Sequence, residues 1–397
     1  MHHWNGSAAL PGFAAFTLAT ALGAAPLAAQ TPDTTVADTA GAAVAQAPAE
    51  RTTIGGYGEV HYTNARGAGT PGTINLRRFV LFVGHSFSER LAFRSEVEIE
   101  DAKIEGGEPG GEVALEQAYI DYRFSPAFTL RTGLLLAPVG IVNEVHEPPT
   151  FNGVERPDFD HDVIPTTWRE LGIGAAGSFG QSGLGYRLYL LNGLKGSGLS
   201  ADEGIRGGRQ EGHEAGFQNP SLTGRLEYGR PGLKLGASFW YGGTAEQNPA
   251  IGTGTFDAPI FLAAADARYD VGAFQFRGVF ANIQIPDADR LNAAYGGAVA
   301  KRITGGYAEG AVNLLAVLVP AATQQLNAFV RHERYDTQAD VPAGVTDDPA
   351  NARRLTTFGL TYKPLWNVAF KGDYQLRRNA AGTGEGEVFR LGAGYQF

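Results

Sequence analysis

The chain has 397 residues, of which 43% are hydrophobic and 11% aromatic, and its formal net charge is -9. The acidic balance argues against a nucleic acid partner, because a phosphate-binding face needs an excess of Lys and Arg. The absence of cysteine excludes disulfides, thiolate metal sites and thiol catalysis. Beyond the N-terminus no run of about 18 apolar residues occurs, so any membrane contact must be made by strands rather than helices.

The N-terminal segment is typical of an export signal. The stretch SAALPGFAAFTLATALGAAPLAAQ has an apolar core between Phe13 and Ala25 and small residues at Ala28 and Ala29, which predicts a signal peptide over residues 1–29. A membrane anchor is the alternative, but Pro and Gly interrupt the segment. Residues 30–52 are low in complexity and have no large apolar side chain other than Val, so they are predicted to be a disordered linker.

From residue 53 to residue 397, one pattern repeats. Segments of about ten residues alternate apolar with polar side chains and are separated by Gly, Pro, Asn and Asp, as in transmembrane barrels. In LAFRSEVEIE, for example, the apolar side chains from Leu91 to Ile99 oppose the charged side chains from Arg94 to Glu100. Strands are predicted to start near residues 54, 74, 91, 113, 127, 169, 184, 221, 233, 260, 273, 303, 325, 355, 366 and 387. The sequence therefore predicts an all-β fold, a transmembrane antiparallel β-barrel of about 16 strands.

Alternation alone does not distinguish this barrel from a soluble sandwich, in which the charged face would be outside and the apolar face inside. The export signal, the aromatic residues at strand ends and the apolar face of the last strand, which ends at Phe397, favour a barrel in the bacterial cell outer membrane. Barrel closure then places the strand near Ile54 beside the strand that ends at Phe397.

The register is ambiguous in the segment INLRRFVLFVG. Either Val80 and Phe82 or Phe79, Leu81 and Val83 face lipid, and a shift of one residue exchanges the two faces.

The longest connection, residues 137–167, has little periodicity. Loops of this length in an economical chain are usually functional or disordered, and a 16-stranded barrel leaves an aqueous channel that such a loop can narrow. We therefore predict a constriction loop, held to the wall by its apolar side chains, with its charged side chains in water. Its candidate residues are Glu144, His146, Glu147, Glu155, Arg156, Asp158, Asp160, His161 and Asp162. A loop on the extracellular surface is the alternative.

Catalytic and cofactor motifs are weak. GIGAAG at Gly172 to Gly177 fits the dinucleotide fingerprint, but a strand follows it where that fingerprint needs a helix, so no cofactor is predicted. His146, Glu147, Asp158, Asp160, His161 and Asp162 have ligand-type side chains but match no metal spacing, so no metal is predicted either. No catalytic residue is assigned, and His161 with Asp162 is the pair to test in a barrel enzyme.

Several segments together resemble one known family. LRRFVLFVGHSF, LAPVGIVNEVHEPP, GVERP, IPTTWRELGIG, FVRHERYDTQ, GLTYKP and the last strand are similar to the phosphate-selective porin O and P family of outer-membrane barrels. The resemblance implies a 16-stranded, homotrimeric pore with an inward loop and a ladder of arginines along the wall. The candidate ladder residues are Arg77, Arg94, Arg123, Arg131, Arg268, Arg277, Arg331, Arg377 and Arg390. The family's constriction lysines have no counterpart in the loop, and Glu96, Glu98, Asp121, Glu333 and Asp373 also alternate into the predicted lumen, so a mixed or weakly selective pore is expected.

The prediction is a passive porin, not an enzyme, for small hydrophilic solutes or ions, with anions such as phosphate among the candidates. The predicted partners are outer-membrane lipid, these solutes, the barrel-assembly machinery through Phe397, and two further copies of the chain in a homotrimer. A barrel enzyme and a structural or adhesive barrel are the alternatives.

Overall fold

The computed structural model describes residues 51–66, 71–102, 111–244, 248–250, 253–383 and 386–397. The predicted signal peptide and residues 30–50 of the predicted linker lie outside the described residues. The first strand begins at Thr52, one residue before the predicted barrel boundary.

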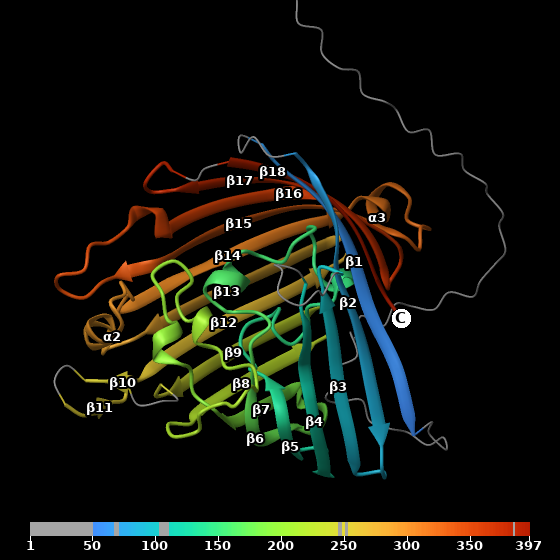
Figure 1. The fold of residues 1–397 in the computed structure, drawn as a ribbon. Coiled ribbons are helices and arrows are strands. Elements are labelled where there is room, and N and C mark those ends of the chain that lie inside the picture. Colours follow the sequence, from blue (N-terminus) through green and yellow to red (C-terminus); the bar gives the residue numbers. More distant parts are fainter. Residues whose placement is uncertain (1–50, 67–70, 103–110, 245–247, 251–252, 384–385) are drawn as a thin grey trace, which may run out of the picture. The chain divides into compact units, whose positions relative to one another are not determined.

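Sixteen antiparallel strands form a closed barrel, in which each strand pairs with its neighbours along the chain (Figure 1). This confirms the predicted fold class and strand count. The strands are β1 (Thr52–Arg66), β2 (Thr73–Ser86), β3 (Leu91–Glu100), β4 (Val113–Ser125), β5 (Phe128–Leu136), β6 (Arg169–Ser178), β7 (Leu184–Leu191), β8 (Ser221–Arg230), β9 (Leu233–Gly242), β12 (Ile260–Val271), β13 (Phe274–Gln284), β14 (Arg302–Asn313), β15 (Gln325–Asp340), β16 (Ala352–Leu365), β17 (Val368–Asn379) and β18 (Gly386–Gln396).

The connections carry only short elements. Turns of two to four residues join β2 to β3, β4 to β5, β8 to β9, β12 to β13 and β16 to β17 at one end of the barrel, and longer connections such as residues 137–168 and 192–220 lie at the other. The short elements are η1 (Pro148–Thr150), α1 (Phe159–Asp162), η2 (Gly180–Ser182), η3 (Gly196–Gly198), η4 (Arg206–Gly208), β10 (Asn248–Pro249), β11 (Thr255–Phe256), α2 (Ala288–Tyr295), α3 (Leu314–Leu318) and η5 (Pro349–Asn351). Within the described ranges, no helix is both long enough and apolar enough to cross a membrane.

The two faces of the wall have the orientation of a membrane barrel. Phe370 and Leu391 are 52% and 47% exposed on the outer surface, whereas Lys371 and Arg390 on the same strands are 6% and 4% exposed. A soluble sandwich would show the reverse. The apolar side chains therefore face the surroundings and the charged side chains face the interior, as predicted.

The seam between the first and last strands closes the barrel. β1 pairs with β18 over ten residues of register, from Tyr57 opposite Gln396 to Arg66 opposite Glu387. Beyond that register, the Gly56 N–H donates to the Phe397 carbonyl oxygen at 3.0 Å, and the Phe397 N–H donates to the Gly56 carbonyl oxygen at 2.9 Å. The C-terminal residue is thus held by two backbone hydrogen bonds, and the predicted neighbourhood of β1 and the chain end is confirmed.

The ambiguous register of β2 is settled by a β-bulge. Val80 is fully buried, and the ring of Phe82 lies 5.7 Å from that of the buried Tyr57, so these side chains point inward. Phe79, Leu81 and Val83 therefore face outward. The pairing with β1 skips one residue between Glu59 opposite Arg78 and Val60 opposite Leu76, which leaves Arg77 as the extra residue.

Candidate functional site

The connection between β5 and β6, residues 137–168, runs inside the barrel. Its apolar side chains are buried against the inner wall, and the Trp168 ring packs at a tilt of 34° on the Trp240 ring of β9, with centroids 4.2 Å apart. The predicted anchoring side chains are all buried: Val139, Ile141, Phe151, Val154, Ile164 and Trp168. The inward loop is confirmed, and the alternative of an extracellular surface loop is wrong. Packing against the inner wall removes these apolar side chains from water, which favours the inward position.

Polar contacts join this loop, which we call the constriction loop, to the wall on the far side of the lumen. The Val154 N–H donates to Asp373 Oδ2 of β17 at 2.6 Å, and the Phe159 N–H donates to Glu333 Oε2 of β15 at 2.9 Å. The Asn152 side-chain amide donates to Glu309 Oε1 of β14 at 3.0 Å. Wall carboxylates thus replace water as acceptors for loop donors, as buried backbone groups require.

Two wall lysines also reach the constriction loop, although the loop itself has no lysine. Lys363 Nζ donates to the Pro149 carbonyl oxygen at 2.6 Å, and Lys371 Nζ lies 3.7 Å from the centre of the Phe151 ring. Arg277 donates to the Thr150 carbonyl oxygen at 2.8 Å. The loop therefore meets cations on this side, supplied by β13, β16 and β17.

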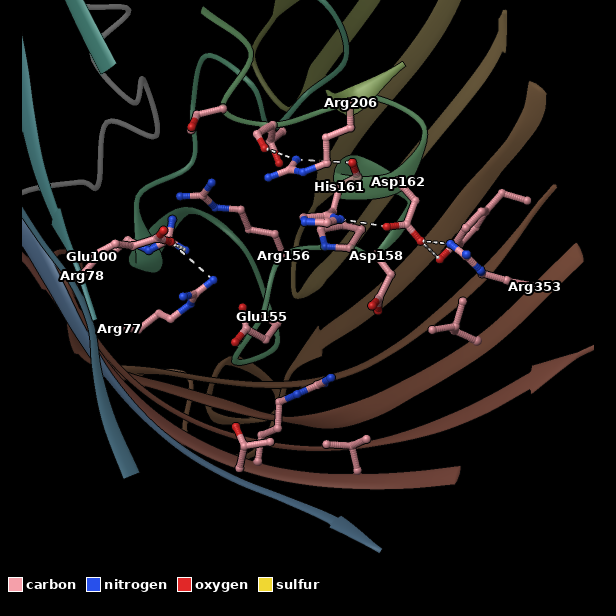
Figure 2. Close-up of a pocket in the computed structure, with 18 of the residues that line it drawn as sticks. Arg77, Arg78, Glu100, Glu155, Arg156, Asp158, His161, Asp162, Arg206 and Arg353 are labelled. Atoms are coloured by element: carbon pink, nitrogen blue, oxygen red, sulfur yellow. Dashed lines mark hydrogen bonds and ion pairs between the residues drawn. The ribbon is translucent and has the colours of Figure 1, made fainter. Parts of the chain in front are cut away.

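A cavity of about 780 Å³ lies beside the constriction loop (Figure 2). Its charged lining contains ten arginines and seven carboxylates, so arginines outnumber carboxylates by three. The arginines are Arg77, Arg78, Arg156, Arg169, Arg206, Arg209, Arg353, Arg377, Arg378 and Arg390, and the carboxylates belong to Glu98, Glu100, Glu112, Glu155, Asp158, Asp162 and Glu211. The cavity lies in a barrel of net negative charge but has a positive lining.

On one side of the cavity, arginines of β2 face the loop (Figure 2). Arg77 pairs with Glu100 at 3.3 Å, and Arg78 Nε lies 2.8 Å from Glu59 Oε1. Arg156 projects from the loop toward them, and its Nε and Nη2 have no hydrogen-bond partner among the residues that the structure describes. Both nitrogens are buried, so Arg156 adds positive charge to the cavity lining without presenting these two donors to open water.

On the other side, Asp162 of α1 is held by three groups. His161 Nδ1 lies 2.7 Å from Asp162 Oδ1, the Tyr335 hydroxyl donates to Oδ2 at 2.7 Å, and Arg353 pairs with the same oxygen. Burial acts to raise the pKa of this carboxyl, but the His161 hydrogen bond and the Arg353 charge outweigh it and hold the pKa below its usual value. Arg377 similarly pairs with Asp158 at 3.3 Å.

The predicted ladder residues do not form one continuous row. Arg77, Arg377, Arg390 and Glu98 line the cavity. The others lie elsewhere on the inner wall or at its rim. Arg131 makes two hydrogen bonds to Asp121 at 2.8 and 2.9 Å, Arg331 pairs with Glu333 at 3.0 Å and with Glu309 at 3.4 Å, and Arg268 lies 3.9 Å from Glu227. Asp373 pairs with Arg390 at 3.4 Å, Arg94 shares the inner face of β3 with Glu96, and Arg123 donates to the Glu89 carbonyl oxygen in a turn.

The predicted residues of the constriction loop also divide into those that line the cavity and those that lie elsewhere. Glu155, Arg156, Asp158, His161 and Asp162 line the cavity. Glu144 instead pairs with Arg187 of β7 at 2.9 Å, and the side chain of Glu147 is partly buried. The expectation that the charged side chains all stay in water is wrong for Asp160, which is fully buried, because α1 packs against β14 and β15.

Six cavity arginines were not among the predicted candidates. Arg78 was missed because the bulge at Arg77 turns two consecutive arginines toward the lumen, which strict alternation does not allow. The other five are Arg169, Arg206, Arg209, Arg353 and Arg378, which lie near strand ends or in the connection after β7. The sequence contains two signals that could have indicated some of these arginines. Arg77 and Arg78 are adjacent inside a strand pattern, and Arg206 and Arg209 flank two glycines in a long connection.

The motifs that suggested other chemistry have structural explanations. GIGAAG lies within β6, which pairs with β5 and β7, so no helix follows it. The His161–Asp162 hydrogen bond forms at the cavity, but neither serine nor cysteine is among the described residues that line it. The hydroxyls in the lining belong to Thr63, Thr166, Thr167 and Tyr335, and that of Tyr335 donates to Asp162.

Comparison with known proteins gives one relative in sequence and several in fold. No family model matches the chain. An uncharacterized protein of Aquifex aeolicus (strain VF5) is 37% identical over 356 residues, which cover 87% of this chain and 79% of the relative.

Among solved structures, the chain is similar to an anion-selective porin from Comamonas acidovorans (TM-score 0.55, 13% identity, 87% of this chain and 99% of that one). It is also similar to OmpF of Salmonella typhi in complex with daunomycin (TM-score 0.57, 15% identity, 87% and 97%) and to the trimer form of Vibrio cholerae OmpT (TM-score 0.54, 10% identity, 87% and 99%). These likenesses show a porin-like outer-membrane barrel fold. With the apolar outer surface, they agree with the predicted location in the bacterial outer membrane.

Proposed function

The chain belongs to the same family as the uncharacterized protein of Aquifex aeolicus, and on that premise we propose that it is a passive pore for small hydrophilic solutes, with a preference for anions. The observation that carries this proposal is the cavity beside the constriction loop, which lies inside a closed barrel and has ten arginines against seven carboxylates in its lining. A lumen lined by one excess sign raises the local concentration of the opposite ion.

The charges support weak rather than tight binding. Most cavity arginines are already paired with a carboxylate, as Arg77 is with Glu100 and Arg377 with Asp158. A passing anion therefore meets partly neutralised cations, each of which holds it weakly, and weak sites in series allow release as well as entry. Arg156 differs, because two of its donors have no partner among the described residues. We assign it the largest single contribution to selectivity.

Three finer properties belong to the same proposal. The resemblance to the phosphate-selective porin O and P family makes inorganic phosphate one anion to test, and Lys363 and Lys371 supply cations at the loop from the wall. The trimer form of the Vibrio cholerae protein, which shares the fold, supports a homotrimer as the assembly. Phe397, held in the closing seam, is the proposed contact for the barrel-assembly machinery.

The proposal is tested by planar-bilayer recordings of the folded chain across a KCl gradient. We expect a conducting pore whose reversal potential shows anion preference. Arg156→Gln should lower the anion-to-cation permeability ratio about two- to fivefold, because a unit charge at about 4 Å in water acts with ~1 kcal/mol. Arg90→Gln is the matched control, since Arg90 is exposed in the turn before β3 and does not line the cavity.

No conductance from correctly folded protein would overturn the proposal of a pore. An unchanged reversal potential in Arg156→Gln would overturn the role of Arg156. A barrel enzyme is the second candidate, because the His161–Asp162 hydrogen bond of 2.7 Å forms at the cavity. It would require hydrolysis of peptides or lipids that disappears in His161→Ala.

A further inference from the structure

Two carboxylates and one imidazole converge between the wall and the constriction loop. Glu96 of β3, Glu116 of β4 and His146 of the loop are all buried, and one ligand atom from each lies within 4.8 Å of the other two. The cluster is separate from the cavity of the proposed pore, whose lining includes none of these three residues.

A β-bulge builds the wall side of the cluster. The pairing of β3 with β4 shifts between Glu96 opposite Gln117 and Val97 opposite Leu115, which leaves Glu116 as the extra residue. The bulge allows two consecutive side chains to reach Glu96: Glu116 itself, and Gln117, whose amide donates to Glu96 Oε2 at 2.6 Å. Bulges of this kind re-aim side chains and are frequent beside functional sites.

The loop side of the cluster presents one specific nitrogen. His146 Nδ1 lies 3.1 Å from the Asn143 carbonyl oxygen, which can only accept, so Nδ1 carries a hydrogen. In the neutral ring Nε2 then has its lone pair directed at Glu96 Oε1, 3.5 Å away, and Glu116 Oε2, 3.3 Å away. A metal-binding histidine usually donates the N–H of its other ring nitrogen to a carbonyl or carboxylate oxygen in this way.

The distances fit a shared metal better than a shared proton. A charge-assisted hydrogen bond between an imidazolium and a carboxylate is about 2.7–2.9 Å long. Both Nε2 contacts are longer. In a tetrahedral zinc site with metal–ligand distances of about 2.0–2.2 Å, neighbouring ligand atoms lie about 3.3–3.5 Å apart.

Two buried carboxylate oxygens in the cluster lack an N–H or O–H donor among the described residues. Glu96 Oε1 and Glu116 Oε1 are fully buried and accept no hydrogen bond from the residues that the structure describes, and the nearby Tyr57 hydroxyl also has no partner among them. The Tyr57 ring packs edge-on to His146 with centroids 6.0 Å apart. Orphaned carboxylate oxygens in a dry site are costly unless a cation satisfies them.

A second histidine of the same barrel shows the contrasting arrangement. His61 of β1 also lies between two carboxylates, but each ring nitrogen faces only one of them: Nε2 faces Glu59 at 3.1 Å and Nδ1 faces Glu155 at 3.0 Å. Two nitrogens that each face a carboxylate are satisfied by a protonated ring with two N–H donors. His146 directs a single nitrogen at two carboxylates, and one proton there serves only one of them well.

We propose that Glu96, Glu116 and His146 bind a divalent transition-metal ion of the zinc type, which ties the constriction loop to β3 and β4. The donor set of one imidazole and two carboxylates selects zinc-like ions over Ca²⁺ and Mg²⁺, which prefer oxygen ligands alone. The two carboxylates and a neutral imidazole balance the double positive charge. Further charges also act on the site: Glu98 and Arg156 interact electrostatically with Glu116, and Arg78 interacts with Glu98. The proposed metal site does not depend on whether the pore conducts.

The test is equilibrium dialysis of the folded full-length chain in detergent, first stripped with a chelator and then exposed to Zn²⁺. We expect about one tightly held Zn²⁺ per chain that excess Mg²⁺ and Ca²⁺ do not displace. His146→Asn and Glu116→Gln should weaken binding by more than the roughly 10- to 100-fold that loss of an outer-shell partner costs. His61→Asn is the matched control and should bind as the unaltered chain does.

A second measurement needs no variant. Co²⁺ added to the stripped chain should give the visible absorption of a tetrahedral site, and Zn²⁺ should remove it. Absence of tight Zn²⁺ binding by the unaltered chain, or equal binding by folded His146→Asn, would overturn the proposal and leave a protonated imidazole bridging the two carboxylates. Heat-dependent gel migration shows whether each variant has formed the barrel.

Discussion

Arginines on the inner wall of this barrel are mostly held by carboxylates. Arg131 donates two hydrogen bonds to Asp121 and lies 4.1 Å from the centre of the Tyr119 ring, and Arg331 bridges Glu309 and Glu333. Such pairs are well satisfied and stiffen the wall, and removing one member costs about 3–5 kcal/mol because the other charge stays buried. Under the proposed function, selectivity therefore depends on the arginines by which the cavity lining exceeds its carboxylates, Arg156 among them.

One loop carboxyl, that of Asp160, is buried and forms no ion pair with a cation in the part of the chain that the structure describes. Burial raises the pKa of Asp160 to about 8, and the charge of Glu333 adds to that effect. Because the folded state holds this proton more tightly than the unfolded chain, the stability it contributes is complete below about pH 4 and is lost as the pH rises through 8. Asp160→Asn should therefore raise the free energy of unfolding by about 2–5 kcal/mol at pH 9 and change it little at pH 4.

The measurement is denaturant unfolding of the barrel in detergent at the two pH values. Asp270→Asn, at an exposed carboxyl near the end of β12, is the control and should show no such difference. An equal gain in stability at pH 4 and pH 9 would contradict the argument. It would mean that ionisation of the Asp160 carboxyl at high pH does not destabilise the fold.

At the scale of elements, the constriction loop is held by contacts with two separate parts of the barrel wall. Apolar side chains fix it near β9, and wall carboxylates fix it by accepting from Val154 and Phe159 across the lumen. The loop position depends on these distant contacts, because its own short elements, η1 and α1, have three and four residues. Its mobility is therefore set by the wall and not by helix propensity.

Loss of one such contact should loosen the loop. Asp373→Ala removes the acceptor of the Val154 N–H and the partner of Arg390. An unsatisfied buried N–H costs about 1–3 kcal/mol, which favours loop positions that expose it to water. We expect single-channel recordings to show more frequent switching between conductance levels and a larger mean conductance than in the unaltered chain.

Glu89→Ala is the control for this experiment, because Glu89 is exposed in the turn between β2 and β3. Traces of Asp373→Ala that match those of the control in switching rate and mean conductance would show that this contact does not hold the loop.

At the scale of the whole molecule, stability depends on which face of the wall meets hydrocarbon. Leu391 is at the middle of β18 and is 47% exposed on the outer surface. An arginine at the bilayer midplane on the lipid face costs about 2–4 kcal/mol. Leu391→Arg should lower the free energy of unfolding in lipid vesicles by this amount, whereas Leu391→Ala, which changes size without charge, should lower it less. Equal losses in the two variants would contradict the membrane orientation.

Strand positions and wall orientation were predictable from the sequence. The segments LAFRSEVEIE and NVAFKGDYQLRR alternate with a period of two, and the structure places the apolar side chains of both outside and the charged side chains inside. The predicted start of β3 is the observed one, and that of β16 differs by three residues. Alternation is a local property of the strand, so ten consecutive residues are enough to reveal it.

The sequence by itself determined the barrel, its strand count and which face of each strand meets lipid. Only the tertiary structure decided where the chain departs from strict alternation and which distant residues meet. The bulges at Arg77 and Glu116 turn consecutive side chains toward the lumen, and Asp160 is buried although the next residue, His161, is exposed. Glu96, Glu116 and His146 match no metal spacing along the chain, because barrel closure and the path of the constriction loop, rather than any local period, bring them together.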